Sequence, residues 1–255
     1  MSAAGVSERT PRLAVVTGAS RGIGRAIALR LARDGADIVG AGSSIDGLAA
    51  VAAEVRRLGR RFHPMAADLA DPDAALGLAE RIEDQHGTPD VLVQAAGINR
   101  RAPAVEHSTL DWDDVVGVNL RSPFILAREF GRGMVRRGSG RIVFVASLLS
   151  FQGGLTVPGY AASKGGVAQL TKALANEWAA SGVNVNAIAP GYVATDMNDA
   201  LQADPVRHRQ ISERIPAGRW ARPDDIAGAV AFLTSPDADY VHGVVLPVDG
   251  GWLAR

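Results

Sequence analysis

Short apolar runs alternate along the chain with longer stretches in which apolar side chains recur at helical spacing. We predict strands at residues 13–17, 36–41, 61–66, 91–95, 141–146, 183–187 and 244–248. We predict helices at residues 23–33, 48–58, 72–86, 112–137, 160–181 and 224–233, with a bend at Pro123. Strands that alternate with helices are typical of βαβ crossovers and a parallel sheet. The pattern therefore predicts a single α/β domain over residues 1–255, a doubly wound, parallel, seven-stranded sheet with helices on both faces.

Two segments do not follow this alternation. Residues 191–217 are long, polar and weakly periodic, and they lie between the sixth strand and the last helix. Long connections in compact domains are usually lids or binding loops, and this one falls at the carboxyl edge of the predicted sheet. We therefore expect a substrate-binding loop or lid at 191–217. Residues 1–10 are polar, and we expect them to be disordered.

Composition narrows the classes of partner and site. Lys+Arg and Asp+Glu both number 27, so the chain has no net charge that would favour nucleic acid or an anionic membrane. It has no cysteine, and its five histidines are scattered without metal-ligand spacing, so we expect no metal site. The N-terminus does not have the pattern of a signal peptide, and no apolar run is long enough to span a membrane. We expect a soluble, cytoplasmic protein with no nucleic-acid or membrane partner.

The first predicted strand ends in a glycine-rich turn, Gly18-Ala-Ser-Arg-Gly-Ile-Gly24, which leads directly into the first helix. Glycine permits a tight turn and close approach of the backbone to a pyrophosphate. The helix N-terminus adds free N–H groups and the positive end of the helix dipole. At the first strand-to-helix junction of a βαβ chain, this turn predicts a Rossmann-type dinucleotide site.

A second motif, Tyr160-Ala-Ala-Ser-Lys164, places a tyrosine and a lysine four residues apart on one face of a predicted helix. Hydride transfer at a secondary alcohol needs a base for the hydroxyl proton near neutral pH, and a free tyrosine has a pKa near 10. A neighbouring ammonium group favours the phenolate. We therefore predict that Lys164 lowers the pKa of Tyr160.

The GxxxGxG spacing of the turn, together with Tyr-x-x-x-Lys, resembles the classical short-chain dehydrogenase/reductase family, and the resemblance covers almost the whole chain. It implies an active enzyme with a catalytic tetrad of Asn119, Ser147, Tyr160 and Lys164, in which Asn119 holds a water that extends a proton relay to Lys164. A non-catalytic, cofactor-binding scaffold would normally have lost one of the four. The nucleotide-binding residues that the resemblance implies are Gly18, Ser20, Arg21, Gly22, Ile23, Gly24, Ser43, Asp68, Leu69, Ala96, Gly97, Tyr160, Lys164, Pro190, Gly191, Val193 and Thr195.

Two further expectations follow from the resemblance. The family's usual Asn-Asn-Ala-Gly after the fourth strand is Gln94-Ala-Ala-Gly97 here, which removes hydrogen bonds that brace the sheet. Family members commonly form tetramers, and we expect a homotetramer in which Trp252 is buried against a neighbouring subunit.

The choice between NAD and NADP stays open. No acidic side chain ends the second strand, where it would bind the ribose 2′-hydroxyl, and Arg21 can pair with a 2′-phosphate. These features favour NADP. The branch of the family that the chain resembles most also lacks the acid and is associated with NAD.

Several longer stretches, such as Asp111–Val115 and Leu174–Trp178, are similar to 2-deoxy-D-gluconate 3-dehydrogenases, also called 2-dehydro-3-deoxy-D-gluconate 5-dehydrogenases. Gluconate 5-dehydrogenases and 3-oxoacyl-carrier-protein reductases are the alternatives. The first two classes imply a sugar acid as substrate, and the substrate-binding candidates are Arg101, Gln152 and Met197, with Arg100 beside Arg101. A carrier-protein reductase would need a basic docking face, for which Arg128, Arg132, Arg136 and Arg137 are candidates.

Overall fold

The computed structural model describes residues 11–255, which form one sheet of seven parallel strands in the order β3-β2-β1-β4-β5-β6-β7. The predicted doubly wound sheet is confirmed. The expectation made for residues 1–10 lies outside the described residues. The strands are β1 (Leu13–Thr17), β2 (Asp37–Gly42), β3 (Phe62–Ala66), β4 (Val91–Gln94), β5 (Gly140–Val145), β6 (Val183–Pro190) and β7 (Val245–Val248).

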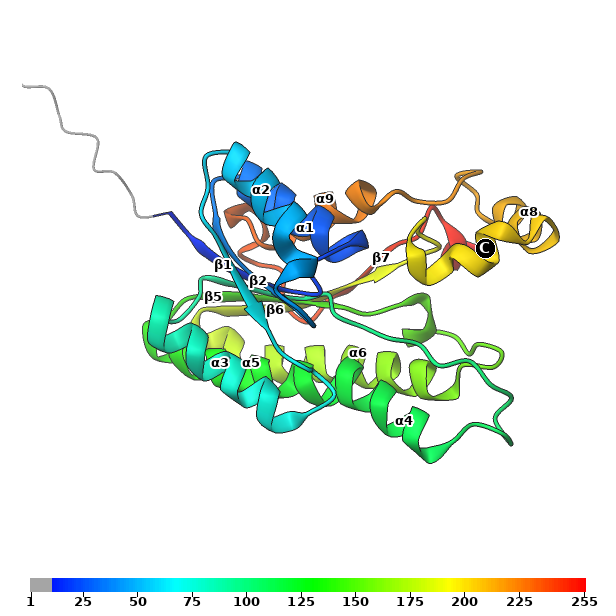
Figure 1. Ribbon diagram of the computed structural model, residues 1–255, viewed down its shortest axis with the longest axis horizontal. Coiled ribbons are helices and arrows are strands. Elements are labelled where there is room, and N and C mark those ends of the chain that lie inside the picture. The colour runs from blue at the N-terminus through cyan, green and yellow to red at the C-terminus, as the bar shows by residue number, and fades with distance from the viewer. Residues whose placement is uncertain (1–10) are drawn as a thin grey trace, which may run out of the picture.

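Helices cover both faces of the sheet, as Figure 1 shows. One layer holds α1 (Gly22–Arg33), α2 (Ala49–Arg57) and α9 (Pro223–Leu233). The opposite layer holds α3 (Pro72–His86), α4 (Thr109–Val116), α5 (Ser122–Arg137) and α6 (Pro158–Trp178). Among residues 11–255, none of these helices is both long and apolar enough to cross a bilayer.

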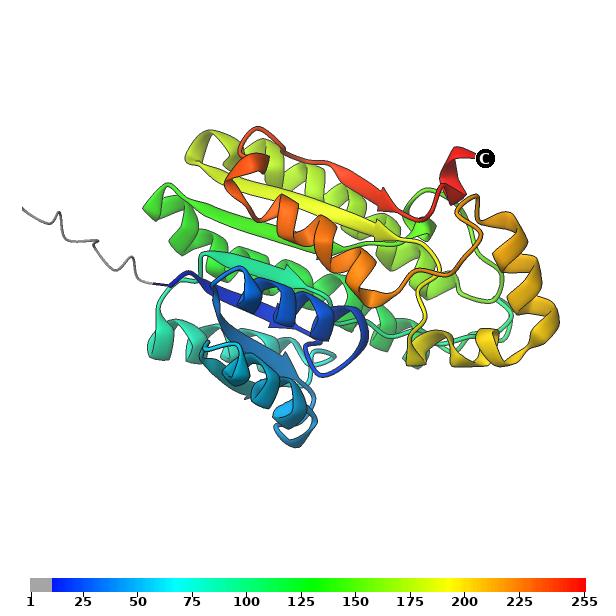
Figure 2. The same ribbon diagram turned by 90° about the horizontal axis from the view of Figure 1, so that it is seen from above.

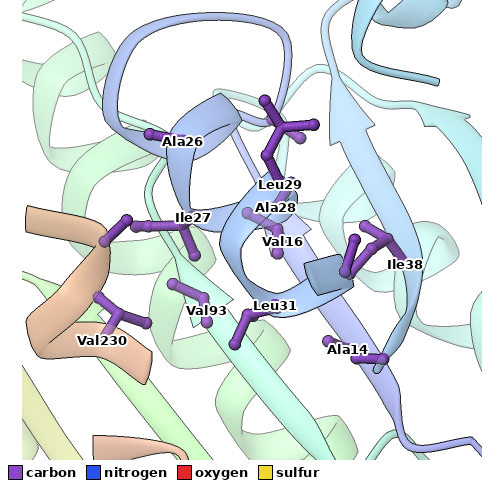
Figure 3. Packing of buried hydrophobic residues seen from close by; sticks show 14 of the residues in the cluster. Ala14, Val16, Ala26, Ile27, Ala28, Leu29, Leu31, Ile38, Val93 and Val230 are labelled. Atoms are coloured by element: carbon purple, nitrogen blue, oxygen red, sulfur yellow. The ribbon is translucent and has the colours of Figure 1, made fainter. Parts of the chain in front are cut away.

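Strand side chains are buried on both faces of the sheet, which explains why the strands are nearly continuous apolar runs in the sequence. On β1, Ala14 and Val16 pack in one core cluster and Val15 in the other. Figure 3 shows the first cluster, in which Ile27 of α1 lies between Val93 of β4 and Val230 of α9.

The order of the strands determines where a site can form. The sheet grows outward in both directions from the neighbouring strands β1 and β4, and Thr17 is paired with Gln94 at their carboxyl ends. This reversal is the topological switch point at which open α/β sheets bind ligands. The segments that follow β1, β4, β5 and β6 all leave the sheet at this edge.

The predicted helix 112–137 contains an irregularity that the sequence did not predict. It consists of α4, a π-helical turn at Gly117–Arg121, and α5. Pro123 lies in the first turn of α5, where its missing N–H is tolerated, and the irregularity precedes it. Asn119 therefore lies inside the π turn.

The segment 191–217 contains two helices, α7 (Asp199–Ala203) and α8 (Pro205–Arg214), which lie beyond the carboxyl ends of the strands (Figure 2). The Asp204 carboxylate caps α8 by accepting from the backbone N–H groups of Val206 and Arg207. Six 3-10 turns complete the described elements: Asp46–Leu48, Leu148–Ser150, Ala179–Ser181, Asp196–Asn198, Pro236–Ala238 and Trp252–Ala254.

Candidate active site

The glycine-rich turn after β1 packs directly against the segment that follows β4. A Cβ atom on Gly18 would lie 2.8 Å from the Ala96 Cα, and one on Gly24 would lie 2.1 Å from the Gly18 carbonyl oxygen. Gly18 and Gly22 also have positive φ angles, of 67° and 55°. The turn thus requires glycine for both space and conformation, and it leaves a backbone cradle at the start of α1.

The segment after β6 closes this cradle from the other side. A Cβ atom on Gly22 would lie 3.4 Å from Thr195 Cγ2, and Arg21 forms an exposed ion pair of 3.2 Å with Asp196. Gly191 approaches Asp249 so closely that its Cβ would lie 2.7 Å from the Asp249 Cα. The structure therefore brings together predicted nucleotide-binding residues from the segments after β1, β4 and β6.

Other predicted nucleotide-binding residues lie at the same edge with local contacts. Ser43 is exposed just past β2, and the exposed Asp68 accepts a hydrogen bond from the Ala70 N–H at 2.9 Å. Ile23 and Leu69 are half-buried and pack against the two core clusters. Ser20, Pro190 and Val193 are half-buried or buried.

Asn119 is buried and joins two segments of the candidate site. Its Oδ1 accepts from the Ile98 N–H at 2.9 Å, and its Nδ2 donates to the Ile98 carbonyl at 2.9 Å and to Ser163 Oγ at 3.2 Å. Both amide hydrogens thus have protein partners. The structure gives Asn119 the role of a brace between the segment after β4 and α6, and the water relay stays a prediction.

The expected loss of bracing near β4 is partly compensated. The side chain of Gln94 is buried and donates to the Pro123 carbonyl at 2.8 Å, which ties β4 to α5. Thr17 Oγ1 accepts from the Ala96 N–H at 3.2 Å. These two bonds hold the segment after β4 where the family would use two asparagines.

Ser147, Tyr160 and Lys164 come together at the ends of β5 and α6. The Ser147 hydroxyl caps a short 3-10 turn by accepting from the Leu149 N–H, and it lies near enough to Tyr160 to lower the pKa of that phenol. The Lys164 ammonium donates to the Val145 carbonyl at 2.6 Å and lies 5.6 Å from the centroid of the Tyr160 ring. A Cβ atom on Gly97 would lie 3.4 Å from Asn119 Oδ1 and 3.8 Å from Lys164 Nζ, so Gly97 lies beside both of these side chains.

Burial dominates the electrostatics of this group. Burial raises the pKa of Tyr160 above its usual value. The Ser147 hydroxyl and the Arg101 guanidinium act in the opposite direction and lower this pKa by less. Burial also lowers the pKa of Lys164 to about 8. The Lys164 ammonium is turned to the Val145 carbonyl, and the charge that lowers the pKa of Tyr160 here is that of Arg101, so an effect of Lys164 on Tyr160 stays a prediction.

The two neighbouring arginines are used differently. Arg100 lies 3.5 Å from a carboxylate oxygen of Asp111 and 3.8 Å from one of Asp114, so it is paired with α4. Arg101 is exposed and acts on Tyr160. Of the pair, Arg101 is therefore the one available to a substrate.

The remaining substrate candidates are Met197 and Gln152. Met197 is exposed in the 3-10 turn Asp196–Asn198, and Gln152 is half-buried and accepts a hydrogen bond from Trp252. Trp252 is 4% exposed within its own chain, so the expectation that a neighbouring subunit buries it is wrong.

Three hydroxyl side chains that the sequence analysis did not select support the site. They are Thr17, Ser150 and Ser163, of which Ser150 Oγ donates to the Lys164 carbonyl at 2.7 Å. Ser163 precedes Lys164 in the tyrosine motif, so its place in that motif could have identified it from the sequence. The contacts of Thr17 and Ser150 depend on segments far away in the sequence.

A separate cavity of about 830 Å³ lies at the opposite, amino edge of the sheet, among Arg12, Arg137, Arg141 and neighbouring residues. None of the predicted site residues lines it. Within residues 11–255 no group of three or more His, Asp or Glu side chains could hold a metal ion.

Comparison with known proteins places the chain among oxidoreductases. A family model described as enoyl-(acyl carrier protein) reductase matches residues 18–253. The chain is 53% identical to a 2-dehydro-3-deoxy-D-gluconate 5-dehydrogenase of Pseudoalteromonas atlantica over 96% of each sequence. It is 40% identical to a gluconate 5-dehydrogenase of Gluconobacter oxydans over 93% of each.

Solved structures agree with these relatives. A structure from Agrobacterium tumefaciens, described as a 2-deoxy-D-gluconate 3-dehydrogenase with bound NADP, has a TM-score of 0.90 and 51% identity, covering 96% of this chain and 97% of that one. A gluconate 5-dehydrogenase of Burkholderia cenocepacia in complex with NADP and tartrate has a TM-score of 0.92 and 37% identity, covering 97% of each chain.

Proposed function

The chain belongs to the short-chain dehydrogenase/reductase family, and from this premise we propose that it transfers a hydride between NADP and a secondary hydroxyl or ketone of a small sugar acid. The proposed reaction is of the 2-dehydro-3-deoxy-D-gluconate 5-dehydrogenase type. The observation that carries it is the grouping of Ser147, Tyr160 and Lys164 at the switch point of the sheet, with the Arg101 guanidinium near enough to lower the pKa of Tyr160. Arg101 adds a partner for a carboxylate to a site for alcohol chemistry.

The backbone cradle fits a dinucleotide. Gly18, Gly22 and Gly97 leave space that side chains would fill, and the start of α1 offers free N–H groups to a pyrophosphate. NADP is favoured over NAD because the residues after β2, Ser43 and Ser44, carry no acid, and because the exposed Arg21 can exchange its ion pair with Asp196 for a 2′-phosphate. The structural relatives with bound NADP support this choice.

When bound, the nucleotide supplies the hydride acceptor or donor. Tyr160 takes or returns the proton of the substrate hydroxyl, and the Ser147 hydroxyl hydrogen-bonds to the same oxygen. Lys164 places a positive charge beside the phenol. Asn119 fixes the segment after β4 against α6, and we propose that a water beside it extends the proton path to Lys164.

We also propose a homotetramer in the cytoplasm, with no nucleic-acid or membrane partner. Leu110, Trp112 and Phe124 are large apolar side chains exposed on α4 and α5, which supports an interface on these helices. The zero net charge supports the absence of polyanionic partners. A monomeric molar mass in light scattering would contradict the tetramer.

Reduction of carrier-bound 3-oxoacyl groups is the second candidate, which the description of the matching family model favours. Three of the four arginines on the basic face that it would need are already held by contacts within the chain. Arg128 and Arg132 both pair with Glu129, and Arg137 is bonded to the carbonyls of Thr88 and Pro89. These contacts support the sugar-acid reaction over docking of an acidic carrier protein.

The test is turnover, followed by nicotinamide absorbance, on sugar acids and a 3-oxoacyl thioester with NAD and with NADP. We expect the highest kcat/KM with 2-dehydro-3-deoxy-D-gluconate or 2-deoxy-D-gluconate and NADP. Activity confined to the thioester would reject the sugar-acid proposal and leave the catalytic group unchanged.

A further inference from the structure

The last residues of the chain form a tight turn that is attached to the segment 191–217. We call residues 249–255 the C-terminal turn. The Asp249 carboxylate accepts from the N–H groups of Gly251 and Leu253, both at 2.9 Å, and the Gly250 carbonyl accepts from the Ala217 N–H at 3.0 Å. Gly251 has a φ of 90°, and a Cβ there would lie 3.0 Å from the ring of Pro216. The turn is therefore held in a single arrangement.

This arrangement buries Trp252 in a small apolar cluster above the carboxyl edge of the sheet. We call this group the lid cluster, and its buried members are Leu148, Ile211, Ile215, Trp220 and Trp252. The Arg214 guanidinium lies 3.9 Å from the centre of a Trp252 ring, and the Tyr192 ring centroid lies 4.8 Å from that of Trp252. The helix α8, the C-terminal turn and Leu148, which follows Ser147, thus pack in one apolar cluster.

The indole N–H of Trp252 points out of the lid cluster toward Gln152. Trp252 Nε1 donates to Gln152 Oε1 at 3.4 Å, across 100 positions of sequence. An indole N–H can only donate, so the amide oxygen of Gln152 must be the atom that faces it. The amide NH2 group then points away from Trp252, and none of the described residues accepts a hydrogen bond from it.

Gln152 belongs to the same loop as Ser147. Its backbone N–H donates to the Leu148 carbonyl at 3.2 Å, and Ser150 in this loop donates to the Lys164 carbonyl. The backbone of Gln152 is therefore fixed relative to the catalytic group, and Trp252 fixes which end of its amide is free.

We propose that Trp252 is a positioning residue that turns the Gln152 amide so that its NH2 group donates to an oxygen of the acidic substrate. An NH2 group suits a carboxylate or hydroxyl oxygen, whereas the amide oxygen would repel a carboxylate. The C-terminal turn thereby contributes to the preference for an acid. This inference rests on the proposed function and adds a residue that does not touch the substrate.

The test is a double-mutant cycle of Trp252→Phe and Gln152→Ala, with Trp220→Phe as the matched control. Trp220 is 8% exposed in the same cluster, and its indole N–H donates to Ser212 Oγ at 3.2 Å, so its replacement removes an equivalent bond that does not reach Gln152. Two quantities are measured with the NADP-loaded enzyme: KM for 2-dehydro-3-deoxy-D-gluconate, and Kd for tartrate by calorimetry, which needs no turnover.

We expect Trp252→Phe to raise both constants about fivefold, the effect of one neutral hydrogen bond, with kcat and the Kd for NADP changed less than about twofold. Trp220→Phe should leave both constants within about twofold. In the Gln152→Ala background, Trp252→Phe should have little further effect, because the amide that it orients is gone.

The outcomes separate this inference from the proposed function. If the wild type oxidises sugar acids but Trp252→Phe behaves like Trp220→Phe, or its effect adds fully to that of Gln152→Ala, the inference is wrong. If the cycle shows coupling in tartrate binding and no sugar acid is oxidised, the proposed function alone is wrong. A wild type that neither oxidises sugar acids nor binds tartrate contradicts both.

Discussion

At the scale of single residues, Lys164 is a buried ammonium group whose charged form is disfavoured by burial. It is 4% exposed, its amine donates to one carbonyl, and burial lowers its pKa to about 8 from 10.5. Below pH 8 the ammonium is charged in both the folded and the unfolded chain, so the folded protein bears the desolvation cost. Catalytic groups are commonly kept at such a cost to stability.

We therefore predict that Lys164→Met abolishes turnover and stabilises the fold at pH 7, by about 1–3 kcal/mol. In the wild type, the folded chain loses this proton near pH 8 and the unfolded chain near 10.5, so the unfolded state binds more protons between these values and stability rises with pH. The variant should lack that rise. Denaturant unfolding at pH 7 and pH 9.5 measures both effects.

Lys172→Met is the control for this prediction, because Lys172 is exposed on the same helix. It should change neither the stability at pH 7 nor its slope with pH. A Lys164→Met protein that is less stable than the wild type at pH 7 would show that the Val145 hydrogen bond outweighs the desolvation cost.

The residue scale is also where prediction from sequence was least complete. The Tyr160–Lys164 spacing predicted the pair, because positions i and i+4 of a helix lie on one face. It did not predict that the amine turns to Val145, or that Arg100 pairs with α4 while Arg101 acts on Tyr160. These choices depend on segments that only the fold brings together.

At the scale of elements, apolar periodicity predicted all seven strands, because strands buried on both faces need apolar residues throughout. It did not predict the π turn that holds Asn119, since no residue pattern marks such a turn. The sequence predicts a loop or lid at 191–217 with a helix-like stretch after Asn198, but it does not give the bounds of α8, because Ile211 is the buried residue along that helix and makes a weak apolar stripe.

The segment 191–217 is predicted to close over bound ligands. It meets the glycine-rich turn through the Arg21–Asp196 pair and the lid cluster through α8, and exposed ion pairs of this kind are weak enough to open. We expect trypsin cleavage after Arg207 and Arg209 to slow in the presence of NADP and 2-dehydro-3-deoxy-D-gluconate.

Cleavage after Arg60, which is half-buried and follows the exposed turn Leu58-Gly59 at the amino edge of the sheet, is the internal reference for this experiment. It should proceed at the same rate with and without ligands. If cleavage after Arg207 and Arg209 is equally unaffected, the segment does not act as a lid.

At the scale of the whole molecule, the strand order places the catalytic group. The order in which strands are added to the sheet reverses between the parallel strands β1 and β4. The glycine-rich turn, the Ala96–Gly97 segment and the Ser147 loop therefore leave the sheet side by side. The sequence predicted this edge from the alternation of strands and helices. It could not predict that the C-terminus folds back onto the same edge, because Trp252 and Gln152 are 100 positions apart.

The most direct test of the central claim compares the wild type with Tyr160→Phe in NADP-linked oxidation of 2-dehydro-3-deoxy-D-gluconate. The phenol is the proposed proton carrier, so its loss should lower kcat/KM by about 10²–10⁴-fold, while the Kd for NADP changes little. If Tyr160→Phe oxidises the sugar acid as fast as the wild type, Tyr160 does not carry the proton and the proposed chemistry is wrong.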